Sequence, residues 1–295
     1  MNKILNILFL VILMLLVACT NDKSADSKIQ SASDHTVKTL RVGFPPDENP
    51  DAIIRKNKPL LDYIKSRTSV DSIELIVPKT YTAAVEMMSQ GKLDMVYFGG
   101  LTYVLAKKDV DITPLVRGKV GGTAENYTYI VTRTDSGINS IEQLKGKRFA
   151  FGDVASTSGH LIPHKSLLSA GIDPNKDFSD LKYTGAHDKT ALAVFNKEVD
   201  AGAMNARKFP AMVSQGIFTE KEMKILWKSP PFADYPWAAV SSLGEEMLMK
   251  IQTAFVELDD PVMLKLLGVE GYEKTTDQDF ENLRKAAQKL GFMDE

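Results

Sequence analysis

Short apolar runs alternate with segments of helical periodicity through most of the chain beyond residue 39. Residues 40–44 form an alternating run that Pro45 and Pro46 interrupt, which is typical of a strand and its end. Residues 53–66 carry apolar side chains at helical spacing, and a predicted helix at 82–90 is followed by Gly91, a common helix terminator. The same patterns predict strands at 73–77, 93–98 and 127–132 and a short helix at 101–108.

A second set of alternating elements follows residue 140. Strands are expected at 147–151, 181–183, 199–204, 224–227 and 237–241, and helices at 141–144, 159–170, 189–196, 243–257, 261–267 and 277–290. Strands that alternate with helices of about ten residues favour an α/β fold with mainly parallel sheets covered on both faces. Two such units predict two lobes, with a ligand cleft at the carboxyl ends of the strands.

Residues 1–18 are expected to be a signal peptide and not part of the fold. Lys3 precedes about 14 almost purely apolar residues, which is short for a membrane span of ~20 residues and typical of a signal-peptide core. The stretch ends in Leu16-Val17-Ala18-Cys19, which resembles the lipobox of bacterial lipoproteins and implies cleavage before Cys19 and lipidation of its thiol. The alternative is an ordinary signal peptide with a coincidental cysteine. Residues 19–37 are mostly polar and predict a flexible tether between a bacterial membrane and an extracytoplasmic domain.

Composition and charge exclude several classes of function. Lys and Arg total 36 against 38 Asp and Glu, a net charge of −2, so the basic surface of a nucleic-acid-binding protein is not expected. Cys19 is the only cysteine, which rules out a disulfide scaffold and a zinc site built on cysteine pairs. His160 and His164 stand four residues apart on a predicted helix, but no convincing third ligand accompanies them. Neither a metal nor another cofactor is therefore predicted.

The most specific chemical signal follows the predicted strand at 147–151. Ser156, Thr157 and Ser158 stand where the next helix is expected to begin, and Gly159 follows them. The first N–H groups of a helix have no partners within it, and with the helix dipole they favour anions. One of the hydroxyls could be a plain helix cap, but a cap requires only one. Three hydroxyls beside a glycine instead fit a tetrahedral oxyanion of phosphorus or sulfur.

The same segment carries a family resemblance. Residues 145–152, leading into Ser156-Thr157-Ser158-Gly159, resemble the substrate-binding subunits of phosphonate, phosphite and phosphate ABC importers. The likeness continues in order through residues 80–85, 97–103, 185–188 and 199–203. It implies a class II periplasmic-binding-protein fold, in which two α/β lobes are joined by two hinge crossings. Lobe one would comprise residues 38–118 plus 238–295, and lobe two residues 119–237.

The resemblance also implies a set of ligand-binding residues. These are Tyr81, Tyr127, Ser156, Thr157, Ser158, His187 and Asp234, with Tyr97 and Tyr103 as further candidates in a loop after a strand. Asp234 is expected to face the ligand and accept a hydrogen bond from a protonated ligand oxygen. Arg207 lies near a position where relatives that take aminoalkyl phosphonates can carry an acidic residue, which favours phosphite, methylphosphonate or phosphate over 2-aminoethylphosphonate.

The implied function is that of a monomeric extracytoplasmic binding lipoprotein. It would capture a small phosphorus oxyanion and deliver it to an ABC permease and ATPase. The alternative is an oxyanion sensor that signals to a membrane kinase. Enzymatic activity is not predicted, because no Gly-x-Ser-x-Gly elbow flanks Ser156 or Ser158.

Overall fold

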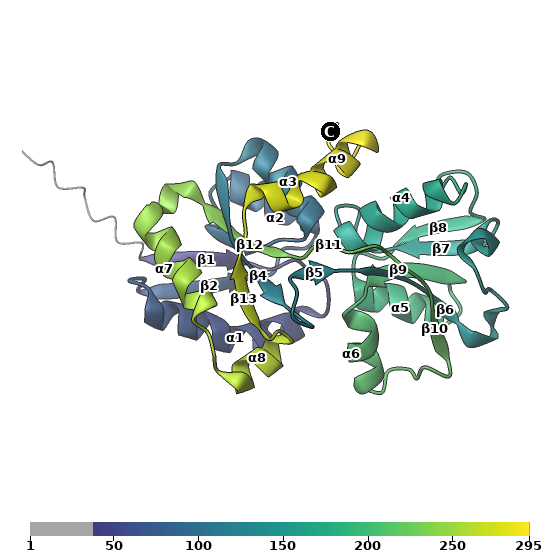
Figure 1. Cartoon of the computed structure of the whole chain (residues 1–295), viewed down its shortest axis with the longest axis horizontal. Helices are drawn as coiled ribbons and strands as arrows, with labels where there is room; N and C mark the ends of the chain where they lie inside the picture. Colours follow the sequence, from purple (N-terminus) through teal and green to yellow (C-terminus); the bar gives the residue numbers. More distant parts are fainter. Residues whose placement is uncertain (1–37, 295) are drawn as a thin grey trace, which may run out of the picture. The chain divides into compact units, whose positions relative to one another are not determined.

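The computed structural model describes residues 38–294 of the chain (Figure 1). The predicted signal peptide at 1–18, the tether at 19–37 and the lipidation site at Cys19 lie outside these residues. Within the described range, no helix is both long enough and apolar enough to cross a membrane.

Lobe one is built on a six-stranded sheet with the order β13-β4-β12-β3-β1-β2. Its strands are β1 (Thr39–Gly43), β2 (Ser72–Ile76), β3 (Met95–Tyr97), β4 (Ile112–Lys119), β12 (Pro236–Val240) and β13 (Gly271–Lys274). One face is covered by α1 (Pro50–Arg67), α7 (Glu245–Val256) and α8 (Pro261–Leu267), and the other by α2 (Tyr81–Ser89), α3 (Gly100–Asp109) and α9 (Glu281–Lys289) (Figure 1). The lobe therefore has three layers, with an apolar core on each side of the sheet.

Lobe two repeats this arrangement with a five-stranded sheet in the order β10-β6-β9-β7-β8. Its strands are β6 (Thr128–Arg133), β7 (Arg148–Phe151), β8 (Asp180–Tyr183), β9 (Ala201–Asn205) and β10 (Met223–Lys228). α5 (His187–Phe195) and α6 (Lys208–Ser214) pack on one face and α4 (Ile162–Ser169) on the other. A π-helical turn, Thr157–Leu161, precedes α4.

Two short strands connect the lobes. β5 (Glu125–Asn126) lies between β4 and β6 in the sequence, and β11 (Phe232–Ala233) lies between β10 and β12. They pair with each other in antiparallel register, so the two crossing segments are hydrogen-bonded together (Figure 1). The two-lobed α/β fold expected from the sequence is confirmed.

The sheets are mixed rather than mainly parallel, which corrects the sequence prediction. β1 pairs in parallel with β2 and β3, and β7 pairs in parallel with β8 and β9. β12, which enters lobe one from the second crossing, runs antiparallel to β3 and β4, and β6, which enters lobe two from the first crossing, runs antiparallel to β9 and β10. A parallel pair needs a long crossover, whereas these strands arrive directly from the other lobe.

Several other elements differ from their predictions. β4, β13 and α6 were not predicted: Pro114 and Gly118 interrupt the pattern of β4, and the other two are only four and seven residues long. The helix expected at 159–170 is a π-helical turn followed by α4. The helix expected at 277–290 begins as a 3₁₀ turn, Asp277–Phe280, before α9.

Candidate functional site

The segment after β7 holds the start of the next helix tightly against the strand. The N–H of Leu161 donates to Ser156 O at 3.0 Å, a bond that spans five residues and makes the turn π-helical. Pro163 favours this wide turn because it has no N–H to donate to Gly159 O. That carbonyl instead accepts from Gly152 N at 3.0 Å, so the turn is bonded to the end of β7.

Ser156, Thr157 and Ser158, which we call the hydroxyl clamp, are fully buried, and their hydroxyls differ in what they contact. Ser156 Oγ accepts from Gly159 N at 3.0 Å and is the N-cap of the turn. Thr157 Oγ1 accepts from Leu101 N at 2.7 Å, across to lobe one. Ser158 Oγ has no hydrogen-bond partner among the described residues. The plain-cap interpretation therefore accounts for Ser156 alone.

Thr157 caps a helix of the opposite lobe. α3 begins after Gly99, which has no side chain to satisfy the first N–H groups of the helix. Thr157 supplies the acceptor for Leu101 N, and accepting this bond leaves its own proton free to be donated elsewhere. One residue further along α3, Thr102 Oγ1 donates to Ala155 O at 3.0 Å. The start of α3 and the clamp thus form one interface.

His187 lies at the start of α5 and is only 1% exposed. Its Nδ1 accepts from Asn205 N at 3.3 Å, and this network assigns the proton to Nε2, which lies 3.4 Å from Tyr235 Oη. Burial lowers the pKa of His187 to about 3, because the charged ring would be desolvated. The imidazole is therefore a neutral donor at ordinary pH.

Two buried hydroxyls at this point lack partners. Tyr81 Oη, at the start of α2 in lobe one, joins Ser158 Oγ in having no hydrogen-bond partner among the described residues. Both interact electrostatically with the Tyr235 phenol, but neither forms a hydrogen bond of good geometry with it. Burial raises the pKa of Tyr81 well above its usual value and that of Tyr235 to about 12, so both phenols stay neutral. An unpaired buried hydroxyl costs about 1–3 kcal/mol, and an oxyanion would supply acceptors for both.

The lobes touch directly around this cluster. His187 N donates to Asp47 O at 3.3 Å, and Tyr81 N donates to Asp153 Oδ2 at 3.4 Å. Lys208 Nζ of lobe two lies 3.2 Å from both Asp47 Oδ2 and Glu48 Oε1 of lobe one. Burial alone would lower the pKa of Lys208, but the two carboxylates outweigh it and hold that pKa above its usual value. The structure is therefore of the closed state.

Asp234 is not a free acceptor, contrary to the expectation from the sequence. Its Oδ1 accepts from Asn126 Nδ2 at 2.7 Å, and its Oδ2 lies 2.6 Å from Arg207 Nη1. The carboxylate is 1% exposed, and this burial raises its pKa even though Arg207 opposes the shift. In this closed state Asp234 is a hinge residue paired with Arg207, and the two charges neutralise each other.

The three remaining tyrosines lie outside the cluster. The prediction that Tyr103 lies in a loop was wrong: it is a buried residue of α3, packs on Phe280, and donates its hydroxyl to Asp277 Oδ1 at 2.8 Å. Tyr127 is half-buried, with Lys228 Nζ 3.8 Å from its ring centroid. Tyr97 packs against Tyr235 at a centroid distance of 5.3 Å and lines the neighbouring pocket.

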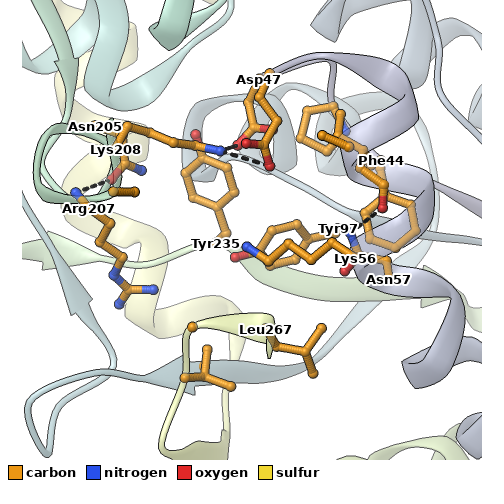
Figure 2. A pocket seen from close by; sticks show the side chains of 18 of the residues that line it. Phe44, Asp47, Lys56, Asn57, Tyr97, Asn205, Arg207, Lys208, Tyr235 and Leu267 are labelled. Carbon is orange, nitrogen blue, oxygen red and sulfur yellow. Dashed lines mark hydrogen bonds and ion pairs between the residues drawn. The ribbon is translucent and has the colours of Figure 1, made fainter. Parts of the chain in front are cut away.

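That pocket has a volume of about 540 Å³ and lies between α1, the start of α6 and the second crossing. We call it the outer pocket. Figure 2 shows Lys56 and Asn57 on one side of it and Asn205, Arg207 and Lys208 on the other. Of the predicted site residues, Tyr97 and Asp234 line it, whereas the hydroxyl clamp and His187 do not. Among the described residues, no group of three potential metal ligands lies together.

Sequence reasoning missed several residues around this site. Tyr235, Asp47 and Lys208 all contact either His187 or one another. Asp47 directly follows the Pro45-Pro46 break after β1, so its position after a strand was an available signal. Lys208 and Tyr235 gave no comparable signal, because their roles depend on contacts between distant segments.

Comparison with known proteins finds a matching family and several relatives. A family model described as the periplasmic substrate-binding protein of phosphonate ABC transporters matches residues 42–280. The phosphate-import protein PhnD of Mycolicibacterium smegmatis is 30% identical over 246 residues, which is 77% of this chain and 76% of that protein. A probable phosphite-binding protein, PhnD1 of Prochlorococcus marinus, is 26% identical over 269 residues, 86% of this chain and 90% of that protein.

A solved structure is also similar. PhnD1 of Prochlorococcus marinus in complex with methylphosphonate superposes with a TM-score of 0.81 at 26% identity, covering 86% of this chain and 98% of that chain.

Proposed function

The chain belongs to the family of periplasmic substrate-binding proteins of phosphonate ABC transporters, and from this we propose that it captures a small phosphorus oxyanion for import. The proposed ligands are phosphite, methylphosphonate and phosphate, in line with the names of the relatives and the ligand of the similar structure. The permease and ATPase of an importer are the partners that its family implies. This favours import over the alternative of signalling to a membrane kinase.

The observation that carries the proposal is the pair of buried hydroxyls without partners. Ser158 Oγ and Tyr81 Oη come from opposite lobes and lie near the same phenol, that of Tyr235. We propose that an oxyanion between the lobes accepts from both, and from His187 Nε2 and the free proton of Thr157 as well. All of these donors are neutral, so the site would bind an anion through hydrogen bonds and helix N-termini rather than through an ion pair.

The wider organisation is part of the same proposal. Lobe one would comprise residues 38–118 plus 238–295 and lobe two residues 119–237, with the bounds moved by one or two residues so that β4, which ends at Lys119, and β12, which begins at Pro236, belong wholly to lobe one. Residues 1–18 would be removed on export, and Cys19 would carry the lipid that holds a monomeric protein to the membrane through the tether at 19–37. We propose no catalytic activity, which agrees with a family of transport proteins.

Globomycin, which blocks lipoprotein signal peptidase, tests the proposed lipidation. It should make the unprocessed form of the protein accumulate, and normal processing in its presence would contradict lipidation at Cys19.

Calorimetric titration of the purified domain tests the ligand proposal. Phosphite, methylphosphonate, phosphate, sulfate and 2-aminoethylphosphonate form the panel. We expect at least one of the first three to bind, with sulfate and 2-aminoethylphosphonate much weaker. Preferred binding of sulfate, or no binding of any phosphorus oxyanion, would contradict the proposal.

A further inference from the structure

The outer pocket shares a wall with the proposed oxyanion site. Asp47, Asn205 and Tyr235 line the pocket. The same three residues contact His187: Asp47 O accepts from its N–H, Asn205 N donates to its Nδ1, and Tyr235 Oη lies beside its Nε2. A single layer of residues therefore separates the pocket from the imidazole. Asn205 and Tyr235 are buried in that layer, so they would have to move apart for a substituent on an oxyanion held by His187 to enter the pocket.

The size and walls of the outer pocket suit an organic group. Its volume of about 540 Å³ lies within the range of roughly 300–1,000 Å³ that is usual for sites of small organic ligands. Phosphite or methylphosphonate alone would leave this space unused. Trp237 packs at ring-centroid distances of 5.2 Å from Phe44 and 5.1 Å from Tyr97, and all three rings line the pocket. Rigid aromatic walls favour the burial of a carbon chain.

The charges of the outer pocket are unbalanced. Its three carboxylates are all paired: Asp47 and Glu48 with Lys208, and Asp234 with Arg207. The ammonium group of Lys56, on α1, has no ion pair or hydrogen bond among the described residues. Its pKa is lowered, first by burial and then by the nearby cation Lys208, and the carboxylates Glu48 and Asp47 only partly oppose this shift. The lining carries four cationic side chains, those of Arg55, Lys56, Arg207 and Lys208, against three carboxylates, so the half-buried pocket favours an anion.

We infer that the outer pocket takes the carbon substituent of an organophosphonate that ends in a second anionic group, such as a carboxylate, and that Lys56 selects for it. This inference rests on the proposed function, because the phosphonate group itself would occupy the clamp. Figure 2 shows Lys56 on the side of the pocket opposite Arg207, and because Asp234 already balances the charge of Arg207, Lys56 is the cation proposed to meet the second anionic group. The ammonium group of 2-aminoethylphosphonate would be repelled there.

Calorimetry with two substituents of similar length tests the inference. 3-Phosphonopropionate carries a terminal carboxylate, and propylphosphonate ends in a methyl group. The affinity of the wild-type protein for 3-phosphonopropionate should be at least about tenfold higher than its affinity for propylphosphonate. This is the difference expected from a hydrogen bond between charged groups. Lys56→Gln should remove most of this preference and leave the affinity for methylphosphonate unchanged. Lys65→Gln is the matched control, because it removes a charge from the same helix outside the pocket and should keep the preference.

The outcomes separate the two proposals. If methylphosphonate binds but the carboxylate brings no preference, or if Lys56→Gln weakens both substituted ligands equally, the inference is wrong and the proposed function stands. If neither methylphosphonate nor any other phosphorus oxyanion binds, the proposed function fails and the inference fails with it.

Discussion

At the scale of single residues, neighbouring hydroxyls of similar chemistry have different roles. Ser156 and Ser158 are two positions apart and both fully buried, yet of their two hydroxyls only that of Ser156 has a hydrogen-bond partner among the described residues. A hydroxyl that caps a turn stabilises the fold, whereas a buried hydroxyl without a partner destabilises it. In the closed state the Ser158 hydroxyl therefore carries a cost that an oxyanion would offset.

Alanine substitution of the two serines should separate folding from binding. Ser156→Ala should lower the free energy of unfolding by about 0.5–2 kcal/mol, because Gly159 N loses its acceptor. Ser158→Ala should leave the stability of the ligand-free protein unchanged or higher, yet weaken oxyanion binding about tenfold or more. Urea unfolding and calorimetry measure both effects. Loss of stability without loss of affinity in Ser158→Ala would show that its hydroxyl serves the fold.

Buried histidines should make the protein less stable in acid. Burial lowers the pKa of His160 to about 4 and that of His187 to about 3, below the value of ~6.5 in an unfolded chain. Between these values the unfolded chain binds more protons than the native protein. The free energy of unfolding should therefore fall as pH decreases from about 6.5 towards 4, by up to ~1.4 kcal/mol per pH unit for each histidine.

The His160→Gln variant tests how much His160 contributes to this pH dependence. The His160 ring donates from Nδ1 to Val154 O at 2.8 Å, a bond that a glutamine amide can replace. Urea unfolding between pH 4.5 and 7.5 should give the variant a shallower dependence on pH than the wild type. Parallel curves would mean that His160 is protonated in the native state.

The predictions for single residues depended on how local the signal was. The clamp was predicted because three hydroxyls and a glycine follow a strand within eight residues, and the structure brings it beside His187 and Tyr81. The hydrogen bond expected from a ligand oxygen to Asp234 stays a prediction, and the sequence did not indicate the ion pair with Arg207, because Arg207 comes from another element. Tyr103 was assigned to a loop from the family resemblance, although the predicted helix at 101–108 already contained it and α3 has it there.

At the scale of elements, the sequence did not predict that a residue of one lobe caps a helix of the other lobe. α3 starts at a pair of glycines and receives its acceptor from Thr157, on the π-helical turn of lobe two. Periodicity predicted both helices but not their contact, because hydrophobic spacing does not identify which lobe a polar residue faces. Strands that contain Pro or Gly, such as β4, were missed for a similar reason. Hydrogen bonds to the neighbouring strands stabilise β4, and its own alternation of apolar and polar residues is too weak to predict it.

Substitutions of Thr157 test the cap. Thr157→Val removes both the acceptor for Leu101 N and the proposed donor to the ligand, so affinity should fall about tenfold or more. Thr157→Ser keeps the hydroxyl and should bind nearly as the wild type does. Thr102→Val loses only the bond from lobe one to Ala155 O and should weaken binding less than Thr157→Val. Equal effects of the two valine variants would argue against contact between Thr157 and the ligand.

At the scale of the whole folded domain, direct contacts between the lobes bias it towards closure. The ion pairs of Lys208 with Asp47 and Glu48 are the largest charged contact between the lobes around the site, and a ligand would add its own contacts with both lobes. A ligand shifts such an equilibrium only by binding the closed state more tightly than the open state. The contacts between the lobes and the contacts of the ligand should therefore both favour the closed state.

Lys208→Met should favour the open state. It leaves Asp47 and Glu48 without their cation at the interface, so the ligand-free variant should have a radius of gyration at least as large as the wild type in small-angle scattering. Its affinity should be lower, because the ligand must offset a larger cost of closure. Lys189→Met, an exposed lysine of the same lobe, is the control and should behave as the wild type does. A more compact Lys208→Met variant would contradict this role.

The central claim is that an oxyanion lies between the hydroxyl clamp and Tyr81, and a crystal structure with methylphosphonate tests it most directly. We predict that phosphonate oxygens lie within hydrogen-bond distance of Ser158 Oγ, Tyr81 Oη and His187 Nε2, and that the methyl group points towards the outer pocket. A phosphonate bound elsewhere, with Ser158 and Tyr81 still unpartnered, would contradict the claim.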